Sequence, residues 1–349
     1  MDIPEISGYP QLRSYCTQAI QNTSIDFIAS AKYPLSTLSV DAFLNTYDNQ
    51  KQGLIIIKSR SSTSEFFIST TDFDQTDNHD VTFVRYRPKR RESLIQLPRS
   101  ALKLLRERSL SSVGGCLHCL HSSDQQTIDV IGSDYRRFFP MFVATLSTYT
   151  PRYHTFNVGL KRYRNGPPQP PLFETALSSY INVQRYNLLS YQNDNSIQID
   201  GSVAKLYQDA LPDVDPDPNT VLLITQPFSE HGDLSETGMI EFVQDAVNDM
   251  ATSFENIYIK THHKERSSKY ESISNATLIE SDEPIERLIP DIAPSAVVGF
   301  TSTALFTVSA FYDINCYTLT DRFPAEISDE LIDCAAFIQS YNQRSMSNW

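Results

Sequence analysis

The chain has 349 residues, of which 42 are acidic and 29 basic, so its formal net charge is -13. This length favours two domains, because a domain has about 150 residues. The acidic balance excludes a protein that coats nucleic acid with its whole surface, although a local basic site is still allowed. The 19 Phe and 18 Tyr residues can fill a packed core, which excludes a disordered chain.

The sequence also indicates the cellular compartment in which the protein is expected. No run of 18 apolar residues is present, and the N-terminal segment MDIPEISGYPQLRSYC lacks the basic, apolar, small-residue order of a secretory signal. The five cysteines are sparse and odd in number, which fits free thiols better than a disulfide framework. We therefore expect a cytoplasmic protein without a membrane span.

The first part of the chain predicts a mixed α/β domain. Apolar runs predict strands at 54–58, 115–120, 127–131 and 153–158, with a helix at 135–146. Two proline-rich stretches, 166–171 and 211–220, should be neither helix nor central strand, because proline lacks the backbone N–H. We expect the domain boundary between these two stretches or at the second.

After residue 220 the pattern becomes regular. Strands are expected at 221–225, 257–260, 276–280, 296–300 and 316–319, and helices at 237–251, 285–288 and 304–311. The apolar residues of 237–251 recur with the i, i+3, i+4, i+7 spacing of a helix that packs on one face. Strands that alternate with helices predict a parallel, doubly wound sheet. Ligands of such sheets bind beyond the carboxyl ends of the strands.

Polar clusters lie at these strand ends. Thr301, Ser302 and Thr303 stand between a strand and a helix, where hydroxyl and backbone N–H groups suit a phosphate, although one hydroxyl could simply cap the helix. His262 and His263 follow another strand and are flanked by cations at 260, 264 and 266. An imidazole with an ordinary pKa of about 6.5 can protonate a phosphate leaving group or donate a hydrogen bond to it.

These clusters resemble motifs of the bacterial sialyltransferase and polysialyltransferase group. The group has K-x-H-P, P-x-E and S/T-S-x-x-L motifs, and the corresponding segments here are KTHH at 260–263, PIE at 284–286 and STAL at 302–305. The stretch ITQPFSEHGDLS at 224–235 also resembles a Q-P-x-x-E-D-G stretch of the group. The resemblance covers roughly residues 125–320, with 130–164 similar to the end of the family's N-terminal domain.

The resemblance implies an α/β fold of the GT-B type, with two Rossmann-like, doubly wound domains that face a cleft. We expect an N-terminal, acceptor-side domain at 1–205 and a C-terminal, nucleotide-binding domain at 206–320. The remaining residues, 321–349, are expected to form a helical tail that packs back on the N-terminal domain.

The resemblance also implies site residues. His262 would contact the CMP phosphate and assist its departure, and Glu286 would hold the ribose hydroxyls. The other expected nucleotide-binding residues are Gln226, Lys260, His263, Thr301, Ser302 and Thr303. His263 stands where the motif has proline, and Asn-Val-Gly at 157–159 stands where the family has an acidic motif. We therefore expect Glu230 or Asp233 to act as the general base in its place, with Glu230 preferred because it matches the acid of the similar stretch.

The implied activity is inverting, metal-independent transfer of sialic acid, or a related nonulosonic acid, from a CMP-sugar to a glycan hydroxyl. No cofactor is expected, because the CMP-sugar is itself the donor substrate. Two alternatives are open: a transferase that uses another nucleotide donor such as CDP-glycerol, and a non-catalytic protein that binds glycans or nucleotides on a degenerate transferase scaffold.

One basic segment stands out in this acidic chain. Residues 85–108 hold nine Lys and Arg, from Arg85 to Arg108, against two Glu. Such a run is often a solvated face. It could also contact anionic lipid, or a lipid-linked glycan acceptor, at the inner face of the membrane. The expected partners are thus a CMP-sugar donor and a glycan acceptor, and not nucleic acid.

Overall fold

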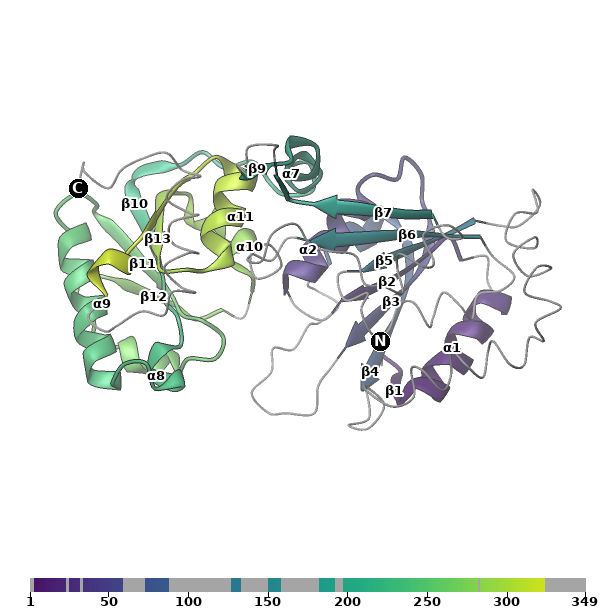
Figure 1. Cartoon of the computed structure of the whole chain (residues 1–349), viewed down its shortest axis with the longest axis horizontal. Coiled ribbons are helices and arrows are strands. Elements are labelled where there is room, and N and C mark those ends of the chain that lie inside the picture. Colours follow the sequence, from purple (N-terminus) through teal and green to yellow (C-terminus); the bar gives the residue numbers. More distant parts are fainter. Residues whose placement is uncertain are drawn as a thin grey trace. The chain divides into compact units, whose positions relative to one another are not determined.

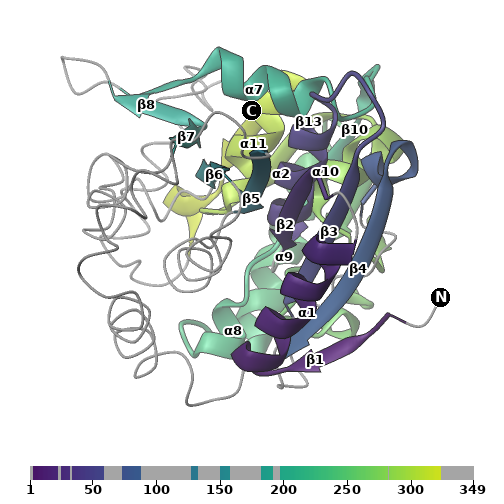
Figure 2. The ribbon, with the colours of Figure 1, turned by 90° about the vertical axis from the view of Figure 1, so that its right-hand side faces the viewer.

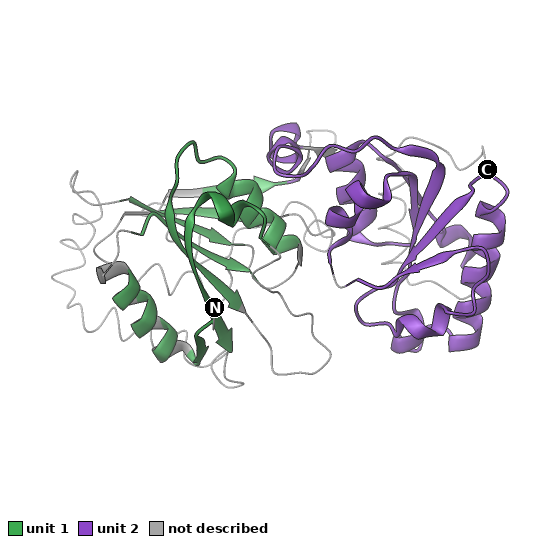
Figure 3. Cartoon of the chain, turned by 180° about the vertical axis from the view of Figure 1, so that it is seen from behind, with its two compact units in different colours: residues 1–63, 67–157, 168–187 green, residues 64–66, 158–167, 188–349 purple. Residues whose placement is uncertain are grey.

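The computed structural model describes residues 3–22, 25–31, 34–58, 73–87, 127–132, 150–157, 182–191, 197–281 and 283–323. The chain divides into two compact units (Figure 3). The first comprises residues 1–63, 67–157 and 168–187, and the second 64–66, 158–167 and 188–349. Within the described ranges, no helix is both long and apolar enough to cross a bilayer.

The first unit is built on a parallel sheet of seven strands, in the order β1-β4-β3-β2-β5-β6-β7 (Figure 1). From β4 to β7 this is the 3-2-1-4-5-6 order of dinucleotide-binding folds, with β1 added at one edge. The expected strands at 54–58, 127–131 and 153–158 are confirmed as β3, β5 and β6. The strand bounds are β1 Glu5–Ser7, β2 Phe27–Ala31, β3 Gln52–Lys58, β4 Asp80–Arg87, β5 Thr127–Gly132, β6 Thr150–Asn157 and β7 Asn182–Asn187.

Helices cover both faces of this sheet. Helix α1 (Tyr9–Asn22) lies along β3 and β4 (Figure 2), and its Leu12 and Cys16 are buried in one core cluster. That cluster takes alternate strand residues, because side chains alternate across a strand; its strand members are Ile6, Ile28, Leu54, Ile56, Val84, Tyr86, Ile128, Val130 and Tyr153. Helix α2 (Pro34–Leu44) packs on β2 and β5. The ring of Phe43, near the end of α2, contacts that of His154. His154 points to the opposite face of the sheet from its neighbour Tyr153, so α2 covers that second face.

Gly53 in β3 leaves room for a buried ring. Phe27 lies opposite Gly53 in the register and is 0% exposed. A Cβ at position 53 would lie 2.0 Å from Phe27 Cζ. We expect Gly53→Ala to destabilise the protein by about 1–3 kcal/mol in urea unfolding, because the ring must leave its packed position.

The matched control is Gly201→Ala, at the start of helix α7 (Gly201–Gln208), where an added Cβ meets nothing within 4 Å. Alanine favours helix over glycine, so this variant should be as stable as the parent or slightly more stable. Equal unfolding midpoints for Gly53→Ala and the parent would contradict the proposed ring contact.

A buried carboxylate joins the central strands on the α2 face. Arg152 donates two hydrogen bonds of 2.8 Å to Asp129, and Tyr47 Oη donates one of 2.7 Å. His154 Nε2 donates to the same carboxylate at 3.0 Å, so His154 Nδ1 accepts from Tyr186 Oη at 3.1 Å. Burial acts to raise the pKa of Asp129, but these hydrogen bonds outweigh it and lower the pKa to about 2.

The second unit holds a parallel sheet of five strands, in the order β12-β11-β10-β13-β14. The order reverses between β10 and β13, which is the switch point of a doubly wound sheet. The bounds are β10 Asp217–Ile224, β11 Asn256–Lys260, β12 Thr277–Ile279, β13 Pro294–Gly299 and β14 Asn315–Thr318. A short antiparallel pair, β8 (Leu189–Tyr191) and β9 (Ile197–Ile199), precedes α7.

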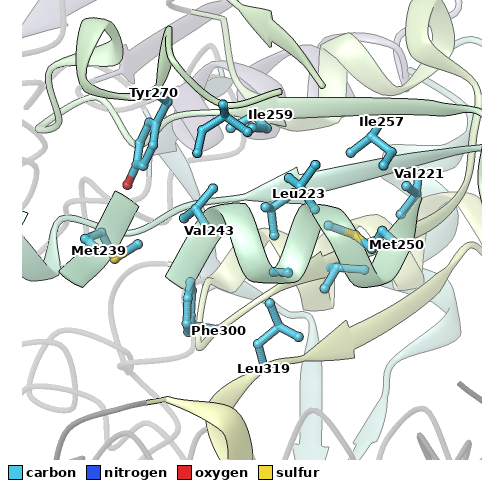
Figure 4. Packing of buried hydrophobic residues seen from close by; sticks show 14 of the residues in the cluster. Val221, Leu223, Met239, Val243, Met250, Ile257, Ile259, Tyr270, Phe300 and Leu319 are labelled. Carbon is cyan, nitrogen blue, oxygen red and sulfur yellow. The ribbon is translucent and has the colours of Figure 1, made fainter. Parts of the chain in front are cut away.

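Helix α9 (Glu236–Met250) covers one face of the second sheet. It begins at Ser235, whose hydroxyl accepts from Gly238 N–H. Figure 4 shows Met239, Val243 and Met250 packed among apolar side chains of the strands; those labelled are Val221, Leu223, Ile257 and Ile259. Helices α10 (Ile285–Ile292) and α11 (Thr303–Tyr312) pack on each other, and α11 also packs on β13 and β14. The helix predicted at 237–251 is thus confirmed, as is the α/β fold with two parallel, doubly wound sheets.

Two expectations were wrong, one about the start of a strand and one about the end of a helix. β10 begins at Asp217, inside the stretch predicted to be a break, because Pro218 sits at the irregular start of the strand, where the register shifts before Val221. Helix α10 ends at Ile292, four residues beyond the prediction, and contains Pro290. Pro290 cannot donate to the Glu286 carbonyl, and Tyr312 Oη donates to that carbonyl instead, at 2.5 Å.

Helix α7 spans the predicted boundary at 205/206 and lies in the second unit. Tyr207 stacks on Phe311 at 4.5 Å between ring centroids, and Gln208 Nε2 donates to Ala310 O at 3.1 Å. The domain limits remain a prediction in other respects. The expected elements at 115–120 and 135–146, the proline stretch at 166–171 and nearly all of the tail lie outside the described residues.

Candidate functional site

Three strand ends of the second sheet lie side by side. The register pairs Ile224 with Lys260 in β10 and β11, and Leu223 with Val298 in β10 and β13. The pairing continues past the strands, since Thr225 N–H donates to Lys260 O at 3.1 Å. The segments that follow β10, β11 and β13 therefore meet at one edge, next to the switch point.

His262 is held in a defined state at this edge. Its Nδ1 accepts from Lys264 N–H at 3.3 Å, so the proton of the neutral ring is on Nε2. Burial, as the largest cause, and the nearby His263, Lys264, His231 and Lys260 together lower the pKa of His262 to about 3. The imidazole is therefore neutral near pH 7 and can donate one hydrogen bond through Nε2.

Lys260 and His263 flank His262 in different settings. Lys260 is 8% exposed, and its Nζ donates to Ser281 O at 2.5 Å. The ammonium of Lys260 is thus directed toward the segment between β12 and α10. His263 is exposed, and its ring lies 4.1 Å from that of His262 between centroids.

Helix α11 begins at the same edge. Ser302 is its N-cap, and Ser302 Oγ accepts from Ala304 N–H at 3.2 Å. The capping alternative therefore holds for this hydroxyl. Thr301 Oγ1 donates to Gln226 Oε1 at 3.2 Å, which joins the β13 end to the β10 end. Thr303 is the first helical residue, so the positive end of the helix dipole lies at this edge.

Glu286 lies in the first turn of α10 and is 5% exposed. Thr307 Oγ1 donates to Glu286 Oε1, and the same hydroxyl lies 3.3 Å from Thr303 O. The structure thus places Glu286 against the first turn of α11. Burial raises the pKa of Glu286, and the hydrogen bond from Thr307 acts in the opposite direction.

Glu230 lies in helix α8 (Phe228–His231), and its carboxylate is bound by a lysine. Lys269 Nζ lies 2.9 Å from Glu230 Oε1 and 3.1 Å from Oε2, and Ser229 Oγ donates to Oε2 at 2.9 Å. Burial acts to raise the pKa of Glu230, but these hydrogen bonds outweigh it and hold the pKa below its usual value. The carboxylate is thus ionised near pH 7 and is a weaker base than an ordinary glutamate.

Sequence reasoning missed a buried ion pair beneath these residues. Glu265 and Lys269 are four residues apart, and their side chains are 0% and 1% exposed. Lys269 Nζ lies 2.9 Å from Glu265 Oε1. The only signal in the sequence was the i, i+4 spacing of Glu and Lys, which also occurs on many exposed helices.

The chain is similar to several solved structures, each at low sequence identity and with a TM-score below 0.5. E. coli heptosyltransferase WaaC with ADP shows 10% identity, covers 84% of this chain and 86% of that chain, and has a TM-score of 0.35. MurG of Acinetobacter baumannii shows 9% identity over 90% and 82%, with a TM-score of 0.36. UDP-GlcNAc 2-epimerase of Methanocaldococcus jannaschii, with UDP-GlcNAc and UDP, shows 10% identity over 91% and 93%, with a TM-score of 0.41.

No curated protein matches the chain in sequence. The model of the alpha-2,8-polysialyltransferase (POLYST) family, by contrast, matches residues 170–320. The matched segment contains the whole second sheet and every candidate site residue described above. It also contains the three motif segments on which the resemblance to sialyltransferases rests. Over residues 170–320 the chain is therefore similar to sialyltransferases, because this segment matches the alpha-2,8-polysialyltransferase family.

Proposed function

We propose that the protein transfers sialic acid, or a related nonulosonic acid, from a CMP-sugar to a glycan hydroxyl with inversion, and without a divalent metal. The family that residues 170–320 match implies CMP-sialic acid as the donor and a glycan as the acceptor. The observation that carries the proposal is the meeting of the His262 loop and the α11 N-terminus at one sheet edge. Both lie within the segment that matches the family.

The proposed phosphate contacts follow from the charges at this edge. His262 would donate from Nε2 to the CMP phosphate, with Lys260 and His263 adding positive charge. Ser302 and Thr303 would present the N-terminal end of α11 to the phosphate oxygens. Gln226 and Thr301 would hold the neighbouring strand ends in place, and Glu286 would bind ribose hydroxyls.

The chemistry requires stabilisation of the departing CMP. Its phosphate is already ionised, so hydrogen-bond donors and cations that are fixed in place stabilise the charge that develops when the glycosidic bond breaks. A neutral His262 fits this role as a donor. A bound phosphate would also raise the pKa of His262, because an anion nearby favours the imidazolium.

The proposed general base is Glu230, which would take the proton of the acceptor hydroxyl. Its lowered pKa keeps it ionised and able to accept a proton at neutral pH. The ion pair with Lys269 weakens it as a base, so the attacking hydroxyl would have to approach the carboxylate at an oxygen that Lys269 shares.

The acceptor is proposed to bind through the N-terminal domain that the sequence predicts at residues 1–205. Of the basic segment, the structure describes Arg85 to Arg87, where Arg87 Nε lies 2.8 Å from Glu5 Oε1. We propose that the whole segment contacts anionic lipid or a lipid-linked glycan at the inner face of the membrane. Binding to phosphatidylserine vesicles that weakens as salt rises is the expected result.

The proposed function is tested by CMP release from CMP-sialic acid, with and without a glycan acceptor. We expect release that the acceptor accelerates, and thermal stabilisation by CMP that exceeds that by uridine or adenine nucleotides. Glu230→Gln should lower the acceptor-dependent rate by about 10²-fold, since a general base typically contributes 10²- to 10⁴-fold.

The outcomes separate the parts of the proposal. Stabilisation by CDP-glycerol without CMP release would favour the other nucleotide donor. Binding of CMP without any turnover would favour a non-catalytic binding protein. Full activity in Glu230→Gln would remove only the base assignment.

A further inference from the structure

The loop that carries His262 is closed by a buried carboxylate. Glu265 Oε2 accepts from His262 N–H at 2.9 Å, and Glu265 N–H donates to His262 O at 2.8 Å. Together with the bond from Lys264 N–H to His262 Nδ1, these contacts fix the His262 backbone on both sides and the rotation of its ring. The turn at 262–265 is therefore closed around the imidazole.

The same carboxylate anchors the loop to the sheet. Thr225 Oγ1, just beyond β10, donates to Glu265 Oε2 at 2.5 Å. Tyr270 Oη donates to Oε1 at 2.8 Å, and Lys269 Nζ lies 2.9 Å from that oxygen. Each carboxylate oxygen thus has two donors, which is the arrangement that compensates a fully buried carboxylate.

Lys269 extends this network to Glu230. Its Nζ reaches Glu265, Glu230 and Ser229, each at 2.9 Å. Three N–H bonds of the ammonium meet three acceptor groups, so its hydrogen-bonding capacity is used in full. A movement of Glu265 would therefore be passed to α8 as well as to the His262 loop.

We propose that Glu265, held by Lys269, is a positioning residue that fixes the His262 imidazole in the Nε2–H form and couples it to Glu230. This inference deepens the proposed function and rests on it, because it names the residue that holds His262 and Glu230 in place. Those two residues are the ones proposed to act on the donor and the acceptor. Glu265 itself is buried and touches neither substrate.

The test compares Glu265→Gln with the parent in two measurements. The first is the ¹⁵N chemical shift of the His262 ring in the free protein, assigned by its loss in His262→Gln. The parent should show one Nε2–H tautomer, and Glu265→Gln should show a mixture, because an amide oxygen cannot accept from all four donors. The second is kinetics, where kcat should fall by about 10-fold or more while KM for CMP-sialic acid stays within about threefold.

The matched control is Glu236→Gln. Glu236 pairs with Arg266 on the same loop at 2.6 Å, but both side chains are exposed. This variant should keep the His262 tautomer and the parent's kcat, since exposed ion pairs contribute little. If Glu265→Gln fails to fold, Thr225→Val removes only one donor to Glu265 and should shift the same two measurements in the same direction.

The inference would be overturned if Glu265→Gln kept a single Nε2–H tautomer and an unchanged kcat. If Glu265→Gln is unfolded, the same result in Thr225→Val would overturn it. The tautomer measurement needs no substrate. If the parent released no CMP, the proposed function would fail, and the tautomer comparison would still decide whether Glu265 positions His262.

Discussion

Replacement of His262 by alanine is expected to lower kcat for CMP release by about 10²- to 10³-fold, the effect of losing one donor to a developing oxyanion. The reason is the state of the ring: its pKa is lowered to about 3, so it is a neutral donor through Nε2 and not a cation. Steady-state release of CMP from CMP-sialic acid measures the effect. Binding of CMP should weaken less than kcat falls, because the lost bond strengthens as the phosphate departs.

His262→Gln separates hydrogen bonding from proton transfer. The glutamine amide can place an N–H near the position of Nε2, so it should recover part of the activity lost in alanine. Lys264→Ala removes an exposed cation from the same loop and should change kcat by less than about threefold. Equal loss in His262→Gln and His262→Ala would instead indicate that His262 must donate a proton.

The pH dependence of the free enzyme gives a second check on His262. Because its pKa lies near 3 without substrate, kcat/KM should show no inflection from this imidazole between about pH 5 and 8. An inflection near pH 6.5 that disappears in His262→Gln would contradict the neutral state.

Replacement of Asp129 by asparagine is expected to lower the free energy of unfolding by about 3 kcal/mol at pH 7, which urea unfolding would measure. Removing one partner of a buried charge pair costs about 3–5 kcal/mol, and the lower end applies because Arg152 is half-exposed. An amide at position 129 also brings its own N–H groups against the donors Tyr47 and His154.

The effect of Asp129→Asn should depend on pH in a defined direction. The pKa of Asp129 is about 2 when folded and 3.8 ordinarily, so the folded state favours the charged form. The stabilisation is complete above about pH 4 and is lost as the pH falls through about 2, and it amounts to roughly 2 kcal/mol. The difference between parent and variant should therefore shrink over this window.

Asp80→Asn is the control for Asp129, since Asp80 is an exposed acid at the start of β4 in the same sheet. It should change stability by less than about 0.5 kcal/mol at any pH. A loss at Asp129→Asn that is equally large at pH 2 and pH 7 would show that the packing of the side chain, and not its charge, provides the stability.

Much of the second unit could be predicted from the sequence because its signals are local. Apolar runs such as 221–225 and the helical spacing of 237–251 determine strand and helix without long-range information. The first unit was harder to predict: β1, α1, β2, α2, β4 and β7 were missed. Strand β4, for example, alternates between partly exposed and buried residues, and its pairing with β3 depends on residues more than twenty positions apart.

The sequence alone determined which segments form the candidate site. The residues that follow β10, β11 and β13 could be read as strand ends, and parallel strands end at the same edge of a sheet. The motif segments at 260–263, 284–286 and 302–305 lie within the stretch that the polysialyltransferase family matches. Local sequence patterns therefore suffice to predict His262 and Ser302 as residues at these strand ends.

Only the tertiary structure decided the chemical state and support of these residues. The neutral, Nε2–H form of His262 depends on burial and on basic side chains from two segments, 260–264 and α8. The pairing of Glu230 depends on Lys269, 39 positions away in the chain. Hydrogen-bond partners and desolvation are set by which side chains meet in space. The sequence pattern predicts where the strands end. The contacts of Glu265 with the His262 loop and with Thr225 form only when the sheet has folded.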